Sequence, residues 1–227
     1  MKYLYINGDS FCGDGIDEGK TFGELCAKKY DLKIEKDWKG GSSNHRIYRT
    51  TVDFVMNNQD ILDETLFIIG WSKHTRWEFF NCNTNRYIQL GHSGFFDGGK
   101  GVNWKEEYIM EHKFWKGYVS NFCDFNQMKM EYIQMVFSLQ SVLQNCNYLF
   151  YNNFDDTIIS LTDENIDFTR WVKPRTSFDG YLNKFKPEEI RLVWNDKENL
   201  YDDHPNELGH KKWFECIDSR IQIEGIL

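Results

Sequence analysis

The chain has 227 residues and a formal net charge of −8, and hydrophobic residues make up 41 % of it. These values predict a folded protein with a full core, and we expect one domain over residues 1–227. The negative charge argues against a nucleic-acid backbone or an anionic membrane surface as the main partner. No apolar run approaches the roughly 18 residues of a spanning helix, and the first residues do not form a secretory signal, so a cytoplasmic location is expected.

Strands and helices are predicted to alternate along the chain. Short apolar strands are expected at residues 2–6, 31–36, 65–71 and 147–151. Helices with one apolar face are expected at residues 20–29, 45–58, 128–145 and 207 to about 223. Because such an alternation favours parallel pairing, the pattern predicts an α/β fold with a parallel sheet covered by helices on both faces.

Residues 79–127 do not fit this alternation. The segment is rich in aromatic residues and glycines, and we interpret it as an insertion over the carboxyl-end face of the sheet. Two interpretations stay open. The segment is either an additional layer of core or a lid that forms a specificity wall.

Polar segments follow the predicted strands. They are Asn7–Ser10, Gly40–Asn44, Trp71–Arg76 and Asn152-Asn153. Because the carboxyl ends of parallel strands meet at one edge of a sheet, where ligands bind, these segments predict a shared site.

The stretch DDHPNELGH provides a candidate base near the end of the chain. The residue before a proline is pushed toward extended geometry, so His204 is expected on a loop just before the last helix, with Asn206 as the helix cap. A general base needs an imidazole oriented by a carboxylate, and two aspartates precede His204. We interpret His210 as a packed helix residue. The six cysteines are scattered and the two histidines lack metal-ligand spacing, so no metal, disulfide framework or cofactor is expected.

This order of motifs resembles the SGNH (GDSL-type) hydrolase superfamily, and phage-encoded and marine bacterial members have similar stretches. Gly8-Asp9-Ser10 looks like the first block, in which the serine is the nucleophile. Gly40–Asn44 looks like the second block, in which Gly41 and Ser10 would give backbone N–H groups to the oxyanion hole. Residues 202–206 look like the fifth block, which carries the catalytic Asp and His. The resemblance implies a three-layer α/β/α sandwich with a mostly parallel, five-stranded, flavodoxin-like sheet.

The chain departs from the superfamily pattern at two places. Ser72 stands where the third block has an asparagine that donates to the oxyanion, and we assign Ser72 to that role because a hydroxyl can also donate one hydrogen bond. The usual orienting Asp lies three residues before the His, but this position is Tyr201. Asp202 is therefore the first choice for the orienting carboxylate, with Asp203 as the runner-up.

Four other polar or aromatic residues lie in these strand-end segments, and two of them have more than one interpretation. Asp9 is expected to brace the turn before the nucleophile. Arg76 either pairs with Glu78 or binds substrate, and Asn44 either caps a helix or contacts substrate. Trp71 is assigned to substrate binding with them.

The function that the resemblance implies is a serine esterase that removes an acetyl or other short acyl group by a Ser-His-Asp triad and an acyl-enzyme. The aromatic insertion favours a carbohydrate ester over other small-molecule esters. Two alternatives stay open. The same triad would serve an O-acyltransferase, and the missing asparagine would suit a non-catalytic binding or virion protein that kept the fold.

Overall fold

The computed structural model describes residues 1–83, 85–90, 113–114, 117, 121, 124–159, 165–195 and 200–226. The side chains of residues 90, 194, 195 and 200–202 are not described.

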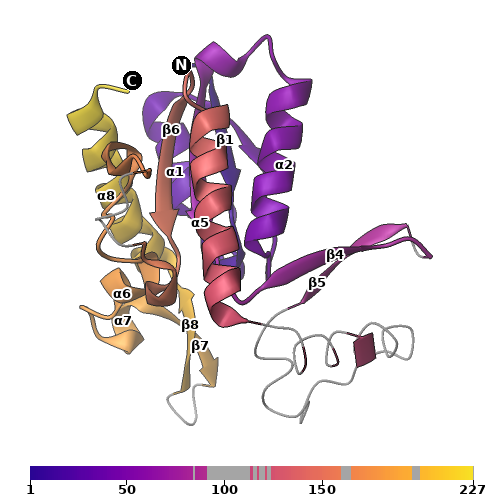
Figure 1. Cartoon of the computed structure of the whole chain (residues 1–227). Helices are drawn as coiled ribbons and strands as arrows, with labels where there is room; N and C mark the ends of the chain where they lie inside the picture. The colour runs from indigo at the N-terminus through magenta and orange to yellow at the C-terminus, as the bar shows by residue number, and fades with distance from the viewer. Residues whose placement is uncertain are drawn as a thin grey trace.

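Four parallel strands form the central sheet, in the order β2-β1-β3-β6 (Figure 1). They are β1 (Tyr3–Asn7), β2 (Lys33–Lys36), β3 (Thr65–Trp71) and β6 (Asn147–Asn152). Tyr3 of β1 lies opposite Lys33 of β2 and Thr65 of β3. Every residue of β3 is buried, because this strand has neighbours on both edges and helices on both faces. The predicted parallel α/β fold is confirmed.

Five strands were predicted, but the described residues contain four in this sheet. At the edge formed by β6, Trp171 makes a single parallel bridge with Phe150, and the Val172 N–H donates to the Phe150 carbonyl at 2.8 Å. Pairing stops there because Lys173 has a φ of +50° and Pro174 has no N–H to donate. The position of a fifth strand is thus reduced to a two-residue contact.

Helices cover the sheet in two layers (Figure 1). The α1 (Phe22–Tyr30) and α8 (Glu207–Glu224) helices lie on one face, and α2 (Asn44–Asn57) and α5 (Phe125–Val142) lie on the other. Alternate residues of β1 feed the two cores. Leu4 and Ile6 pack toward α1 and α8, and Tyr5 packs toward α2 and α5. Burying each such side chain contributes about 1.5–3 kcal/mol. None of the described helices is long and apolar enough to cross a bilayer.

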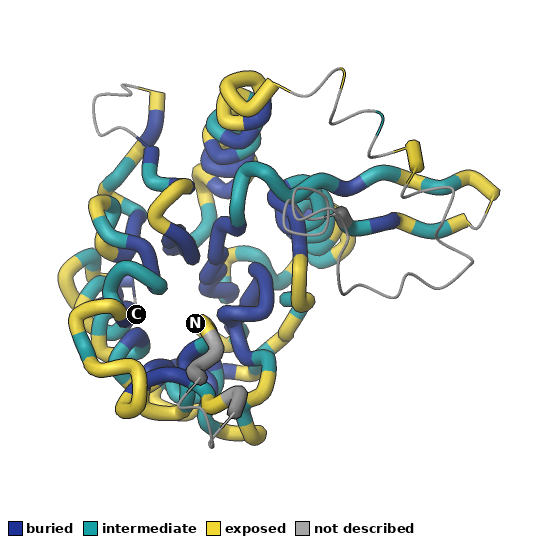
Figure 2. The backbone as a smooth tube through the Cα atoms, turned by 90° about the horizontal axis from the view of Figure 1, so that it is seen from below, coloured by how far each residue is buried: buried dark blue, intermediate teal, exposed yellow. Residues whose placement is uncertain are grey.

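The start of the predicted insertion is an antiparallel hairpin. Its strands are β4 (Trp77–Asn81) and β5 (Arg86–Leu90), and it projects away from the body of the protein (Figures 1 and 2). Most of residues 91–123 lie outside the described residues, so the choice between a core layer and a lid stays a prediction.

A second antiparallel hairpin precedes α8. It consists of β7 (Arg191–Asn195) and β8 (Leu200–Pro205), and the short helices α6 (Phe178–Leu182) and α7 (Pro187–Ile190) come before it. Figure 1 shows both hairpins at the carboxyl end of the parallel sheet. The loop predicted for His204 is therefore wrong, since His204 belongs to β8. The extended geometry imposed by Pro205 is also strand geometry, and β7 supplies the partner.

Candidate active site

Strand β1 ends in the tight turn that presents Ser10. Ser10 is the first residue of the 3-10 helix η1 (Ser10–Cys12) and is 7 % exposed. The Gly8 N–H donates to the Asn7 side-chain oxygen at 2.8 Å. A Cβ on Gly8 would lie 2.5 Å from the Cys12 sulfur and 3.1 Å from the Gly70 carbonyl oxygen, so only glycine fits there.

Asp9 is the centre of a buried polar network behind Ser10. Its Oδ1 accepts hydrogen bonds from the Phe11 N–H at 3.0 Å and from Asn153 Nδ2 at 2.8 Å. Its Oδ2 accepts from Ser72 Oγ and Arg76 Nη1, both at 2.7 Å. The Asp9 side chain is fully buried, and the Arg76 guanidinium neutralises its charge. The predicted bracing of the turn is confirmed by the bond from Phe11.

The hydroxyl of Ser72 serves this network. It donates its one proton to Asp9 and accepts a hydrogen bond from Arg76 Nη1 at 2.7 Å. Ser72 is also fully buried. This arrangement does not fit the predicted role of Ser72 as an oxyanion donor, because a hydroxyl has only one proton to give.

The Gly40–Asn44 segment leads into α2 beside β3. Gly41 has a φ of +71°, a conformation that favours glycine. Asn44 is clamped to the backbone of Ser72, since its Nδ2 donates to the Ser72 carbonyl at 2.9 Å and its Oδ1 accepts from the Ser72 N–H at 2.8 Å. The cap of α2 is Ser43, whose hydroxyl accepts from the Arg46 N–H, so the assignment of the cap to Asn44 is wrong. Asn44 instead ties the second predicted block to the third.

His204 meets the Ser10 turn through an aromatic contact. Its ring centroid lies 5.3 Å from that of Phe11, the residue after the predicted nucleophile, and β8 packs against η1. The Arg191 guanidinium holds the strand, because it donates to the Asp203 carbonyl and pairs with Asp179 at 2.7 Å. The η1 turn and β8 are therefore neighbours at this edge of the sheet, while the pairing of Ser10 with His204 stays a prediction.

The two predicted carboxylate partners of His204, Asp202 and Asp203, directly precede it on β8. Asp203 is exposed, and as the neighbour of His204 in a strand it points to the opposite face. The side chain of Asp202 lies outside the described residues. The other predictions for this segment are confirmed. Asn206 caps α8 by accepting from the Gly209 N–H at 3.1 Å, and His210 is fully buried, where burial lowers its pKa to about 3.

For the third block, the prediction for Trp71 is wrong, and so is the pairing of Arg76 with Glu78, while contact of Arg76 with substrate stays a prediction. The Trp71 ring is fully buried and packs edge-on against Tyr132 and Phe150, so it belongs to the core and cannot line a substrate site. Arg76 pairs with Asp9, while Glu78 pairs with Arg49 from α2 at 2.9 Å.

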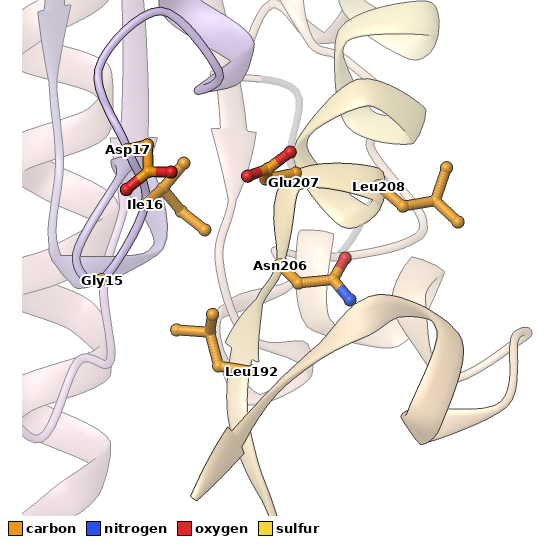
Figure 3. Close-up of a pocket in the computed structure, with 7 residues that line it drawn as sticks. All are labelled: Gly15, Ile16, Asp17, Leu192, Asn206, Glu207 and Leu208. Atoms are coloured by element: carbon orange, nitrogen blue, oxygen red, sulfur yellow. The ribbon is translucent and has the colours of Figure 1, made fainter.

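A pocket of about 450 Å³ lies between the segment that follows η1 and the start of α8 (Figure 3). One side of the pocket is formed by the residues that follow Asp14 in the chain, and the other side includes the first residues of α8. Its lining residues are Gly15, Ile16, Asp17, Leu192, Asn206, Glu207 and Leu208. Among the described residues, no group of three or more His, Cys, Asp or Glu side chains is placed to hold a metal ion.

Comparison with known proteins identifies a family. A family profile matches residues 14–182 of this chain. The chain belongs to DUF6071, a family of unknown function. The matched part of this DUF6071 member includes Gly41, Asn44 and Ser72 but stops short of Ser10 at one end and His204 at the other. A search of curated proteins gives no match. Among solved structures, the chain is similar to the psychrotrophic esterase EstA from Pseudoalteromonas sp., inhibited by monoethylphosphonate, with a TM-score of 0.47 and 12 % identity over 98 % of this chain and 97 % of that chain.

Sequence reasoning missed two contributors to this site of the DUF6071 chain. Asn153 follows β6, in one of the strand-end segments expected at the shared site, and its amide reaches Asp9, a contact that the pattern did not specify. Its position at a strand end was the available signal. Gln89 of β5 accepts from the Ser43 N–H at 2.9 Å, so the β4–β5 hairpin supports the loop that follows Gly41. Nothing in the sequence around Gln89 indicated this contact.

Proposed function

We propose that the protein is a serine ester hydrolase of the SGNH type, with Ser10 as nucleophile and His204 as general base. The observation that carries the proposal is the contact between the Phe11 and His204 rings, because it joins the start of η1 to β8 at the carboxyl edge of the sheet. Ser10 follows a strand that ends in a buried turn braced by the hydrogen bond from the Phe11 N–H to Asp9, so its position is fixed by the core.

The proposed chemistry is acyl transfer. His204 takes the proton of the Ser10 hydroxyl while the hydroxyl oxygen attacks the ester carbonyl carbon. The negative charge on the carbonyl oxygen is held by the N–H of Ser10, which has no intrahelical acceptor at the start of η1, and by the N–H of Gly41. His204 then protonates the leaving alcohol, and a water molecule activated by His204 releases the acyl group from Ser10.

This oxyanion hole has two backbone donors and lacks a side-chain donor from Ser72. The absence of one such donor costs on the order of 3 kcal/mol, or a factor of 10²–10³ in rate. We therefore expect slow hydrolysis of simple esters. The commitment of the Ser72 proton to Asp9 also favours a second candidate, a non-catalytic binding protein that keeps the fold.

A fluorophosphonate probe and p-nitrophenyl acetate separate these candidates. We expect the probe to label the wild type, with labelling and turnover lost in Ser10→Ala and strongly reduced in His204→Ala. Ser141→Ala is a matched control, because Ser141 is exposed on α5 and its hydroxyl bonds only to its own helix. Equal labelling of the wild type and Ser10→Ala would refute the enzyme. Labelling with negligible hydrolysis would favour a very specific ester, such as a glycan ester, or transfer to an alcohol.

A further inference from the structure

The turn that carries Ser10 also carries the carboxylate of Asp14. Asp203 points to the face of β8 opposite His204, so it is not placed to orient the His204 imidazole. Asp14 is different, because its N–H donates to the Ser10 carbonyl at 3.0 Å and it therefore belongs to the same turn as the nucleophile.

Residues before and after Asp14 in the chain contact the β7–β8 hairpin. Before it, the Phe11 ring contacts His204. After it, Gly15 lies against Leu192 of β7, so closely that a Cβ on Gly15 would be 2.8 Å from Leu192 Cδ1 (Figure 3). Asp14 is thus held between two contacts with the hairpin that carries His204.

The Asp14 carboxylate also lies over Gly40. A Cβ on Gly40 would be 2.3 Å from Asp14 Oδ2 and 3.4 Å from its Cγ, so the carboxylate occupies the space that a side chain at residue 40 would need. Gly40 directly precedes Gly41, the proposed backbone donor. The carboxylate therefore lies between the nucleophile turn and the Gly40–Gly41 loop, on a turn that also contacts the β7–β8 hairpin.

We propose that Asp14 is the positioning residue for His204, in place of an aspartate three residues before the histidine. Its negative charge orients the imidazole and stabilises the imidazolium that forms when Ser10 loses its proton. The catalytic meaning of this pairing rests on the proposed esterase function, whereas the pairing itself does not.

The charges around Asp14 and His204 agree with this proposal. Burial raises the pKa of the Asp14 carboxyl, the positive charge of His204 lowers it and the charge of Asp9 raises it again, so the two groups are within electrostatic reach. On α8, His210 is neutral above about pH 3 because of burial and adds no charge. On β8 itself, Asp203 is exposed to solvent, which screens its charge.

Titration of His204 by NMR in the full chain tests the pairing without any turnover. The signal is assigned among the six histidines by comparison with His204→Ala. We expect Asp14→Asn to lower the titration midpoint of His204 by about half a pH unit or more, since a nearby negative charge favours the imidazolium. Asp203→Asn is the matched control and should leave the midpoint in place. An unchanged midpoint in Asp14→Asn, or a shift in Asp202→Asn alone, overturns the proposal.

Kinetics then connect the pairing to catalysis. In Asp14→Asn the acidic limb of the pH profile of kcat/KM should move to lower pH, and kcat should fall at least tenfold with KM little changed. Asp14→Glu should restore part of the rate, which a purely structural role would not require. Gly40→Ala should displace the carboxylate and lose its effect in the Asp14→Asn background.

The outcomes for the pairing and for the enzyme are distinguishable. The esterase is refuted and the pairing is kept if Asp14→Asn shifts the His204 titration midpoint but the wild type is neither labelled by the probe nor hydrolyses an ester. An active wild type whose Asp14→Asn variant matches it in midpoint, pH profile and kcat keeps the esterase and refutes the role of Asp14.

Discussion

Replacing Asp9 by Asn tests whether the buried network behind Ser10 holds this edge of the sheet together. The amide is nearly isosteric with the carboxylate, so it can keep the bonds from Phe11 and Asn153 on one oxygen. Its NH₂ group then faces Ser72 and Arg76, which both donate to Oδ2 in the native protein. The Ser72 hydroxyl can rotate to accept, but the guanidinium, whose side chain is only 18 % exposed, loses its counter-charge.

Removing one partner of a buried ion pair costs about 3–5 kcal/mol. Because Arg76 keeps some contact with water, we expect the lower end, about 3 kcal/mol of the free energy of unfolding. With a urea m-value of about 2 kcal/mol/M, the unfolding midpoint should fall by about 1.5 M. Equilibrium urea unfolding followed by circular dichroism measures this shift.

Asp17→Asn is the matched control for Asp9→Asn. The Asp17 side chain is 79 % exposed and its pair with Lys20 is on the surface, so its loss should change stability by less than about 0.5 kcal/mol. The double variant Asp9→Asn/Arg76→Met should cost less than the sum of the two single variants, because no charge is left without a partner. A loss below about 1 kcal/mol in Asp9→Asn, or strict additivity in the double variant, would refute the reasoning.

Three further predictions concern single residues. Ser72→Ala should lower stability by about 1–2 kcal/mol through its bond to Asp9 yet keep fluorophosphonate labelling within about tenfold, whereas an oxyanion donor would cost 10²–10³. Burial alone would raise the pKa of Glu24, but hydrogen bonds from Lys36 and Thr21 lower it from 4.5 to about 2. The loss of stability in Glu24→Gln should therefore be constant above pH 4.5 and vanish as the pH falls to about 2. Urea unfolding at several pH values measures this dependence. Burial lowers the pKa of His210 to about 3 in the folded protein. Between pH 6.5 and 3, His210 should therefore lower the free energy of unfolding by about 1.4 kcal/mol for each pH unit of acidification. His210→Leu should lack this contribution when its urea unfolding is measured over the same pH range.

Local pattern was sufficient to predict the parts of this protein that depend on local chemistry. The apolar run at residues 65–71 became the buried strand β3, and the periodicity of the four long helices placed each of them within a few residues. The alternation of strands and helices predicted the parallel sheet, and with it the edge at which Ser10 and His204 were expected to meet. These features follow from burial and backbone geometry, which the sequence encodes over short distances.

Only the tertiary structure decided how the side chains at that edge are used. Ser72 and Arg76 looked available for substrate, but the buried Asp9 takes both of them, since a carboxylate without water must find its donors in the protein. Trp71 went to the core because alternation along β3 turns it toward α5. The position of Asp14 beside Gly40 and the His204 strand depends on three segments far apart in the chain, and no short-range pattern encodes such a meeting.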